Sequence, residues 1–382
     1  MDSLTQIVLG AAVGEAVLGK KAGNKAMLWG AVAGTIPDLD ILSRYFMDEV
    51  SALEVHRGFT HSVIFSIICA PVFAYFIKKH ERSFLALFFV FLISVFFFGA
   101  ESITGKAISV AVLFGLFFCA YKLKENHDSI STFDWTKLMF WSLITHPLLD
   151  AHTTWGTQFF WPHDYRLAYK NIFVADPLYT LPFLIFLIMA FVKNKDNPLR
   201  SYYNRLGLIV SSTYMLLTIG FKWIGYHQFT DSLENQQISY NEVRTRPTPF
   251  NSILWSANVE TDSAFYIGMY SLFDKDNDIE FIRYEKNHAA LGLLASEDKI
   301  KRMIKISKGW YIIRKNAEGK LLFCDLRFGQ SGHGKDKPFV FSYIIDRNEY
   351  GEVILKEAPK TFKDGGAMMK DLALRVVGKK AS

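Results

Sequence analysis

The chain has 382 residues, half of them hydrophobic, and a formal net charge of only +6. This length exceeds that of one ordinary compact domain, so we expect parts of different character. The lysines and arginines lie mainly beside apolar segments rather than in a polar and aromatic stripe, which argues against nucleic acid as a partner. The three cysteines are far apart and indicate neither a disulfide framework nor a thiolate metal site.

The first part of the chain contains a series of apolar segments. Strong apolar runs cover residues 63–77, 84–100, 107–121, 178–192 and 206–221, and weaker ones cover 4–18, 26–36 and 136–150. The strong runs approach the length that crosses a bilayer core of about 30 Å. Small residues in the weaker runs, such as Gly10 and Gly30, suit close helix packing. We therefore expect a mainly α, multi-pass transmembrane bundle of about eight helices over residues 1–225.

Positive charge is concentrated in every second loop between these segments. The loops that hold it contain Lys20, Lys21 and Lys25, then Lys78, Lys79 and Arg82, then Lys122, Lys124 and Lys137, then Lys193, Lys195, Arg200 and Arg205. Short basic loops remain on the cytoplasmic side of a membrane. Residues 37–62, residues 151–177 and the C-terminal part are then expected on the outer face of the cell membrane, with the lipid bilayer as the protein's first partner.

Beyond residue 225 the pattern changes to alternating polar and aromatic residues. Strands are predicted over 265–272, 310–314 and 339–345, and a short amphipathic helix over 296–308. From Lys370 onward we expect a loose basic end. Residues 226–382 are therefore predicted to form a small soluble α+β domain.

Three short motifs on the expected outer face carry residues that can bind metal ions. They are PDLD with Asp38 and Asp40, HRGFTHS with His56, Arg57 and His61, and HPLLDAH with His146, Asp150 and His152. Imidazole nitrogens and carboxylate oxygens are ligands for zinc and similar ions. His146 and Asp150 are four residues apart and would share one face of a helix, although Pro147 indicates a bend or a helix start.

Each of these residues also has a structural interpretation. Asp38 or Asp40 could cap a helix at Pro37, His152 could be an interfacial polar group, and Arg57 could bind lipid phosphate. Asp176, just before the run 178–192, is either a helix cap or a carboxylate that supports the site. Ionisable groups beside membrane segments are costly to keep, so three such motifs on one face favour a site.

The motifs also resemble a known family. The segments MDSLTQIVLGAAVGEAVLG, PDLDIL, HRGFTHS, HPLLDAHTTWGTQFFWP and DPLYTLP are similar to those of the YdjM/YbcI-type membrane-bound metal-dependent hydrolases. That family is distantly similar to the zinc-dependent phospholipase C and single-strand nuclease superfamily. The resemblance implies metal ligands at Asp38, at His56 or His61, and at His146 and Asp150, with Asp40 as a further ligand or a base.

The N-terminal motif departs from the family pattern. The family usually has an Asp, about two further residues and then Thr-His, whereas here Asp2 and Thr5 are followed by Gln6. Gln6 offers only a neutral amide, so one metal position is weakened or lost. Asp2 and Gln6 are expected in the surroundings of the site, together with Arg57, His152 and Asp176, where they would bind substrate or support the ligands.

The function expected from these features is metal-dependent hydrolysis. A divalent ion, with zinc as the first choice, would activate water, and Asp40 or Asp150 would take the proton during attack on a phosphodiester or another ester. A lipid or envelope component suits the expected position of the site. The alternative is a non-catalytic membrane binding or scaffold protein, or a transporter, that retains a decayed hydrolase site.

Overall fold

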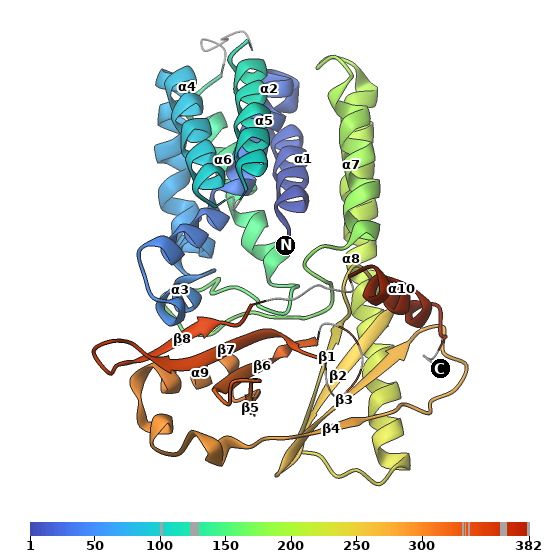
Figure 1. Cartoon of the computed structure of the whole chain (residues 1–382). Coiled ribbons are helices and arrows are strands. Elements are labelled where there is room, and N and C mark those ends of the chain that lie inside the picture. The colour runs from blue at the N-terminus through green and yellow to red at the C-terminus, as the bar shows by residue number, and fades with distance from the viewer. Residues whose placement is uncertain are drawn as a thin grey trace.

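The computed structural model describes residues 1–99, 102–122, 130–330, 332, 334, 337–359 and 365–379. It contains a helical part and a C-terminal part built from β-sheets, which lies at one end of the helices (Figure 1). A mainly helical chain with a C-terminal β part is what the sequence predicts. The predicted run 84–100 ends at a residue outside the described ranges.

Seven long helices make up the helical part. They are α1 (Ser3–Ala22), α2 (Asn24–Thr35), α4 (Val63–Gly99), α5 (Ile103–Tyr121), α6 (Thr132–Asp150), α7 (Pro177–Phe191) and α8 (Pro198–Asn235). Short elements connect α2 to α4, namely the 3-10 helix η1 (Pro37–Tyr45), α3 (Glu49–Val55) and the 3-10 turn η2 (Phe59–His61). Each of the eight predicted apolar runs overlaps one of these helices, and the runs 26–36 and 178–192 each extend one residue past a helix end.

Helix α4 contains two of the predicted runs and folds back between them. His80 has non-helical dihedral angles, φ −139° and ψ 39°. The rings of Phe73 and Phe84 stack with their centroids 5.8 Å apart, whereas eleven residues of straight helix would separate them by about 16 Å. The chain therefore reverses at His80, and its two arms pack side by side.

The expected number of membrane helices is wrong. Among the described residues, two helical segments rather than about eight pass by length and apolar composition alone, namely Val63–Val95, which includes the reversal at His80, and Pro198–Asn235. Helix α2 has 12 residues and α7 has 15, which gives lengths of about 18 and 22 Å, less than the bilayer core of about 30 Å. Helix α1 carries Glu15 and two lysines, and α6 carries His146 and Asp150, so both lack the required apolar composition.

Helices α1 and α2 form a hairpin whose backbones touch. A Cβ atom added to Gly10 would lie 2.3 Å from the carbonyl oxygen of Gly30, and one added to Gly30 would lie 2.2 Å from that of Gly10. Further along, a Cβ on Gly34 would lie 2.5 Å from the carbonyl oxygen of Gln6. The close packing predicted from small residues is thus present.

Buried ion pairs join the helices at the end of the bundle that is opposite the β part. Arg200 Nε lies 2.7 Å from Glu15 Oε1 and joins α8 to α1. Lys25 Nζ lies 2.6 Å from Glu81 Oε2 and joins α2 to α4. The basic loops that the sequence assigns to one side therefore meet at one end of the bundle, the upper end in Figure 1.

The C-terminal part contains two antiparallel sheets of four strands, each in sequence order. The first has β1 (Glu242–Pro247), β2 (Leu254–Glu260), β3 (Ala264–Ser271) and β4 (Ile282–Glu285), and the second has β5 (Tyr311–Lys315), β6 (Leu321–Gln330), β7 (Phe339–Arg347) and β8 (Val353–Glu357). The 3-10 segment η3 (His288–Ser296) and α9 (Asp298–Ser307) lie between the sheets. The predicted strands correspond to β3, β5 and β7, and the predicted amphipathic helix to α9.

The basic C-terminal end is not loose as expected, because it forms helix α10 (Gly365–Val376). Arg375 fixes this helix to the first sheet through Asp274, with Nη1 and Oδ1 2.6 Å apart. The amphipathic pattern of this helix covers only three turns, and the lysines near the end of the chain make it hard to recognise in the sequence.

Two helices of the helical part share hydrophobic cores with the β part. Helix α8 passes residue 226 without a break and buries Phe229 and Leu233 against Trp255 of β2. Helix α3 contributes Val50 and Leu53 to the core of the second sheet. These attachments hold the second sheet next to the segment that contains η1 and η2.

Candidate metal centre

Four side chains from distant parts of the sequence meet beneath the helical bundle. They are Asp38 of η1, His61 of η2, and His146 and Asp150 of α6, and each offers a ligand atom within 4.8 Å of the others. His61, His146 and Asp150 are buried, whereas the side chain of Asp38 is 25% exposed. The cluster therefore opens to solvent on the side of Asp38.

Local backbone structure explains which motif residues meet. Pro37 begins a 3-10 helix, and with about three residues per turn Asp38 and Asp40 point in different directions. Arg57 has a left-handed backbone, φ 55°, which turns the chain between His56 and η2. Helix α6 continues through Pro147, so His146 and Asp150 do lie one turn apart on the same face.

The spacing of the ligand atoms suits one small cation. His61 Nε2 lies 3.1 Å from His146 Nε2, 3.4 Å from Asp38 Oδ1 and 3.3 Å from Asp150 Oδ2. His146 Nε2 lies 3.4 and 3.5 Å from the same two oxygens. Ligands of a tetrahedral zinc ion are separated by roughly 3.3–3.5 Å when the bonds are about 2.0–2.2 Å long. Four of the five distances fall in that range, the distance between the two Nε2 atoms is slightly shorter, and the sixth distance, between the two carboxylate oxygens, is at most 4.8 Å.

Hydrogen bonds behind the rings orient both histidines. His146 Nδ1 lies 2.7 Å from the carbonyl oxygen of Gly34, which can only accept, so Nδ1 carries a proton and Nε2 faces the cluster. His61 Nδ1 faces Asp40 Oδ2 at 3.4 Å and Thr60 Oγ1 at 3.1 Å. Both imidazoles thus direct Nε2 at the same point.

Asp40 and His56 lie behind His61 and outside the four-residue group. Asp40 accepts a hydrogen bond from the backbone N–H of Arg57 at 2.6 Å and faces His56 Nδ1 at 2.9 Å. Burial acts to raise the pKa of Asp40, but the hydrogen bond from His56 and the charge of His61 outweigh it and lower the pKa. Asp40 therefore stays ionised and supports His61.

The carboxylate of Asp38 is also kept ionised. Burial acts to raise its pKa, yet the charge of His146 and the hydrogen bonds from His146 and His61 outweigh burial and hold the pKa well below its usual range. An ionised carboxylate beside two imidazole nitrogens is a suitable cation ligand.

Asp150 is surrounded by donors but retains one oxygen for the cluster. Its Oδ1 accepts a hydrogen bond from Gln6 Nε2 at 3.0 Å and contacts the amino group of Met1. Its Oδ2 lies 3.0 Å from Arg57 Nε but makes no hydrogen bond among the described residues, although it is buried. A buried carboxylate oxygen left without a hydrogen bond needs an explanation, and a cation between the imidazoles would supply one.

The other predicted residues do not join the four-residue group. Asp2 caps α1 by accepting from the backbone N–H of Thr5 at 3.1 Å. His152 Nδ1 lies 2.8 Å from Asn171 Oδ1. Asp176 caps α7 and also accepts from Tyr214 at 2.9 Å and Ser252 at 2.8 Å.

Two contributors to the site carry no clear sequence signal. The carbonyl group of Gly34 orients His146, and any residue type supplies a carbonyl. Thr153 accepts a hydrogen bond from Arg57 Nη1 at 2.9 Å and so fixes Arg57 beside Asp150. In the sequence, only the position of Thr153, three residues after Asp150, indicates that it could lie near the site.

In comparison with protein families, a family model matches most of the helical part. The family model of the YdjM inner membrane proteins matches residues 1–229, which include all four residues of the cluster. No curated protein and no solved structure matches the chain. Because the matched segment exceeds half of the 382 residues, the chain belongs to the YdjM inner membrane protein family.

Proposed function

We propose that the protein is a membrane-bound, metal-dependent hydrolase whose centre is the cluster of Asp38, His61, His146 and Asp150. The observation that carries this proposal is the convergence of two Nε2 atoms and two carboxylate oxygens at separations of 3.1–3.5 Å. A divalent cation held there, with zinc as the first choice for nitrogen and oxygen donors, would lower the pKa of a water and polarise a phosphoryl or carbonyl oxygen.

The residues in and around the cluster would have different roles. Asp38 reaches solvent and lies where water and substrate enter. Asp40 faces His61 Nδ1 and positions the ring, which assigns Asp40 a supporting role rather than direct contact with substrate. Asp150 holds its place through Gln6 and Arg57, and the Arg57 guanidinium supplies positive charge next to an anionic substrate.

The proposed substrate is a phosphodiester or another ester of a lipid or envelope component. Membership of an inner membrane family supports this choice, as do the exposed apolar side chains on α4, α5, α7 and α8. We further propose residues 1–225 as the membrane part and 226–382 as the soluble part. The cluster and the β part would then lie on the outer face, with the basic end of the bundle in the cytoplasm.

A specific observation favours a second function, a metal centre that is structural. Four protein ligands complete a tetrahedral zinc site, whereas catalytic zinc sites usually have three and keep one position open. Under this alternative the ion would stabilise the fold of a scaffold or binding protein, without hydrolysis.

Metal analysis of the detergent-purified protein tests the centre itself. We expect about one equivalent of divalent metal in the wild type, very little in the His146→Ala, Asp150→Ala double variant, and a wild-type amount in the control His288→Ala, whose ring stacks on Tyr311 in the β part. Equal, near-zero metal in the wild type and the double variant would contradict both functions.

Activity then separates the two functions. Hydrolysis of bis(p-nitrophenyl) phosphate that stops with a chelator, returns with zinc and is lost in the double variant supports the hydrolase. Metal that raises the unfolding temperature while no phosphodiester or carboxylic ester is cleaved supports the structural centre.

A further inference from the structure

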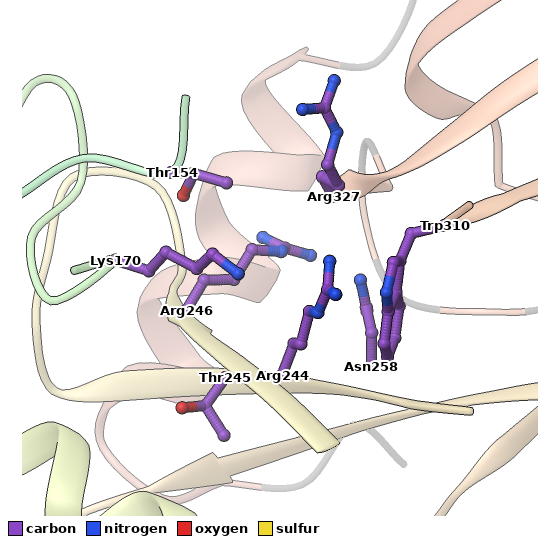
Figure 2. Close-up of a pocket in the computed structure, with 8 residues that line it drawn as sticks. All are labelled: Thr154, Lys170, Arg244, Thr245, Arg246, Asn258, Trp310 and Arg327. Carbon is purple, nitrogen blue, oxygen red and sulfur yellow. The ribbon is translucent and has the colours of Figure 1, made fainter. Parts of the chain in front are cut away.

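A second polar site lies where the β part meets the loop after α6, and six of its eight lining residues are outside the segment matched by the family. It is a pocket between the loop after α6 and strands β1, β2 and β6, lined by Thr154, Lys170, Arg244, Thr245, Arg246, Asn258, Trp310 and Arg327. Figure 2 shows Lys170, Arg244 and Arg246 directing their nitrogen atoms toward a common space. Four of the eight lining side chains are thus basic and none is acidic.

The protein balances only part of the positive charge of this pocket. Arg327 pairs with Asp325 at 2.6 Å, and Arg244 pairs with Glu242 at 2.6 Å. Among the residues that the structure describes, no carboxylate forms an ion pair with Arg246, although its residue surface is only 8% exposed. Its Nη2 lies 3.4 Å from Ser256 Oγ, and its Nε has no hydrogen-bond partner in the described chain.

A buried charge without a partner is expensive, and proteins keep one mainly where something else compensates it. Burial lowers the pKa of Arg246 to about 10. Burial also lowers the pKa of Lys170 to about 7, with further lowering by the nearby Arg244 and Lys308. The pocket therefore concentrates positive charge in a place where water does not screen it.

The backbone is arranged to accommodate these cations. Arg244 and Arg246 alternate along β1 and so point to the same face of the sheet. Arg244 lies over the ring of Trp310, with Cζ 4.3 Å from the ring centre. On the facing strand β6, Gly329 has φ 77°, and a Cβ atom there would lie 1.7 Å from Arg246 Nη2. The absence of a side chain at Gly329 leaves space for the guanidinium of Arg246.

We propose that the cations around this pocket bind a phosphoryl group, which would enter with an oxygen atom because the enclosed space of about 10 Å³ is close to the size of one water. Planar guanidinium groups donate paired hydrogen bonds that match phosphate oxygens, and the Lys170 ammonium adds a point charge. The free donors at Arg246 Nε and Arg244 Nη1 are the contacts that such an anion would complete. The group comes either from free phosphate or from the head group of an anionic lipid. This inference does not depend on hydrolysis at the metal centre.

Binding measurements on the full-length, detergent-purified protein test the proposal. Inorganic phosphate probes the free ion, and short-chain phosphatidylglycerol probes the lipid head group, each followed by calorimetry at constant ionic strength. We expect at least one of the two to bind, with at least tenfold weaker affinity in Arg246→Gln. Arg347→Gln is the matched control, because Arg347 is an exposed arginine of β7, and it should leave the affinity unchanged.

Stability distinguishes a binding site from a structural role. Removal of an unpaired buried charge should leave the unfolding temperature of Arg246→Gln no lower than that of the wild type in phosphate-free buffer. Lys170→Gln, at a half-buried loop position, provides a second variant if Arg246→Gln does not fold, and it should weaken binding in the same way. No binding of either probe, or equal affinity in the wild type and in the folded variants, would overturn the proposal.

Discussion

At the scale of single residues, the metal centre depends on side chains that do not belong to the ligand group. Asp40 has one neighbour in His61 and another in His56, and it also accepts from the backbone of Arg57. It therefore fixes the ring of His61 and the turn that carries it. Supporting carboxylates of this kind typically contribute 10–100-fold to metal affinity.

The Asp40→Asn variant tests this role. The neutral amide should hold His61 less firmly, so we expect metal affinity to fall by about 10–100-fold while the protein stays folded. Competition with a chromophoric chelator measures the change. Asp48→Asn is the control, since Asp48 caps α3 through Val50 and asparagine caps equally well. Equal affinities in the two variants would mean that Asp40 does not support the centre.

Residue spacing could identify the motifs but not the members that meet. His56 and His61 both flank Gly58, and only the left-handed turn at Arg57 decides that His61 faces the cluster. The phosphoryl pocket was missed because Lys170 is far from β1 in sequence. In the sequence, only the alternation of Arg244 and Arg246 along one strand indicates this pocket. The same pattern is also typical of charged residues on a protein surface.

At the scale of elements, the hairpin of α1 and α2 positions one side of the metal centre. Gly34 at the end of α2 orients His146, and Gln6 in α1 donates to Asp150. Both depend on contact between the two backbones at Gly10 and Gly30. A change in the middle of the hairpin should therefore affect the cluster at its end.

A pair of glycine variants tests this dependence. In Gly30→Ala the new methyl group would meet the carbonyl of Gly10, so we expect a loss of about 1–3 kcal/mol in stability and reduced metal content. In Gly220→Ala nothing lies within 4 Å of the new methyl group, and the higher helix propensity of alanine should raise stability by up to about 1 kcal/mol. Thermal unfolding and metal analysis compare them, and shifts of the same sign would refute the argument.

Hydrophobic runs were sufficient to locate helices but not to decide which of them cross a membrane. The runs 63–77 and 84–100 each formed an arm of α4, because the short polar stretch at His80 allows the chain to reverse. Helices α1, α2 and α6 carry apolar residues because these helices pack against one another. Their buried glycine, histidine and aspartate residues make contacts within the protein.

At the scale of the whole molecule, ionisable side chains are concentrated at the two ends of the helical bundle. Buried and half-buried pairs such as Arg200 with Glu15 and Lys25 with Glu81 lie at one end of the bundle, while the cluster and both sheets lie at the other (Figure 1). Under the positive-inside rule the first end is the one that we propose to lie in the cytoplasm.

Reporter fusions test this orientation. Alkaline phosphatase fused after Ser382 should be active, because the β part is proposed to lie on the outer face. The same reporter inserted between α7 and α8, next to Lys195, should be inactive, and green fluorescent protein should give the opposite pattern at both positions. A fluorescent C-terminal fusion would reverse the proposed topology.

Helix α8 is one uninterrupted element of 38 residues, about 57 Å long, and its far end is built into the first sheet. Residues Val50 and Leu53 of α3 also pack in the core of the second sheet, so both sheets share a core with a helix of the helical part. Any movement of the β part relative to the cluster would have to disrupt one of these two cores.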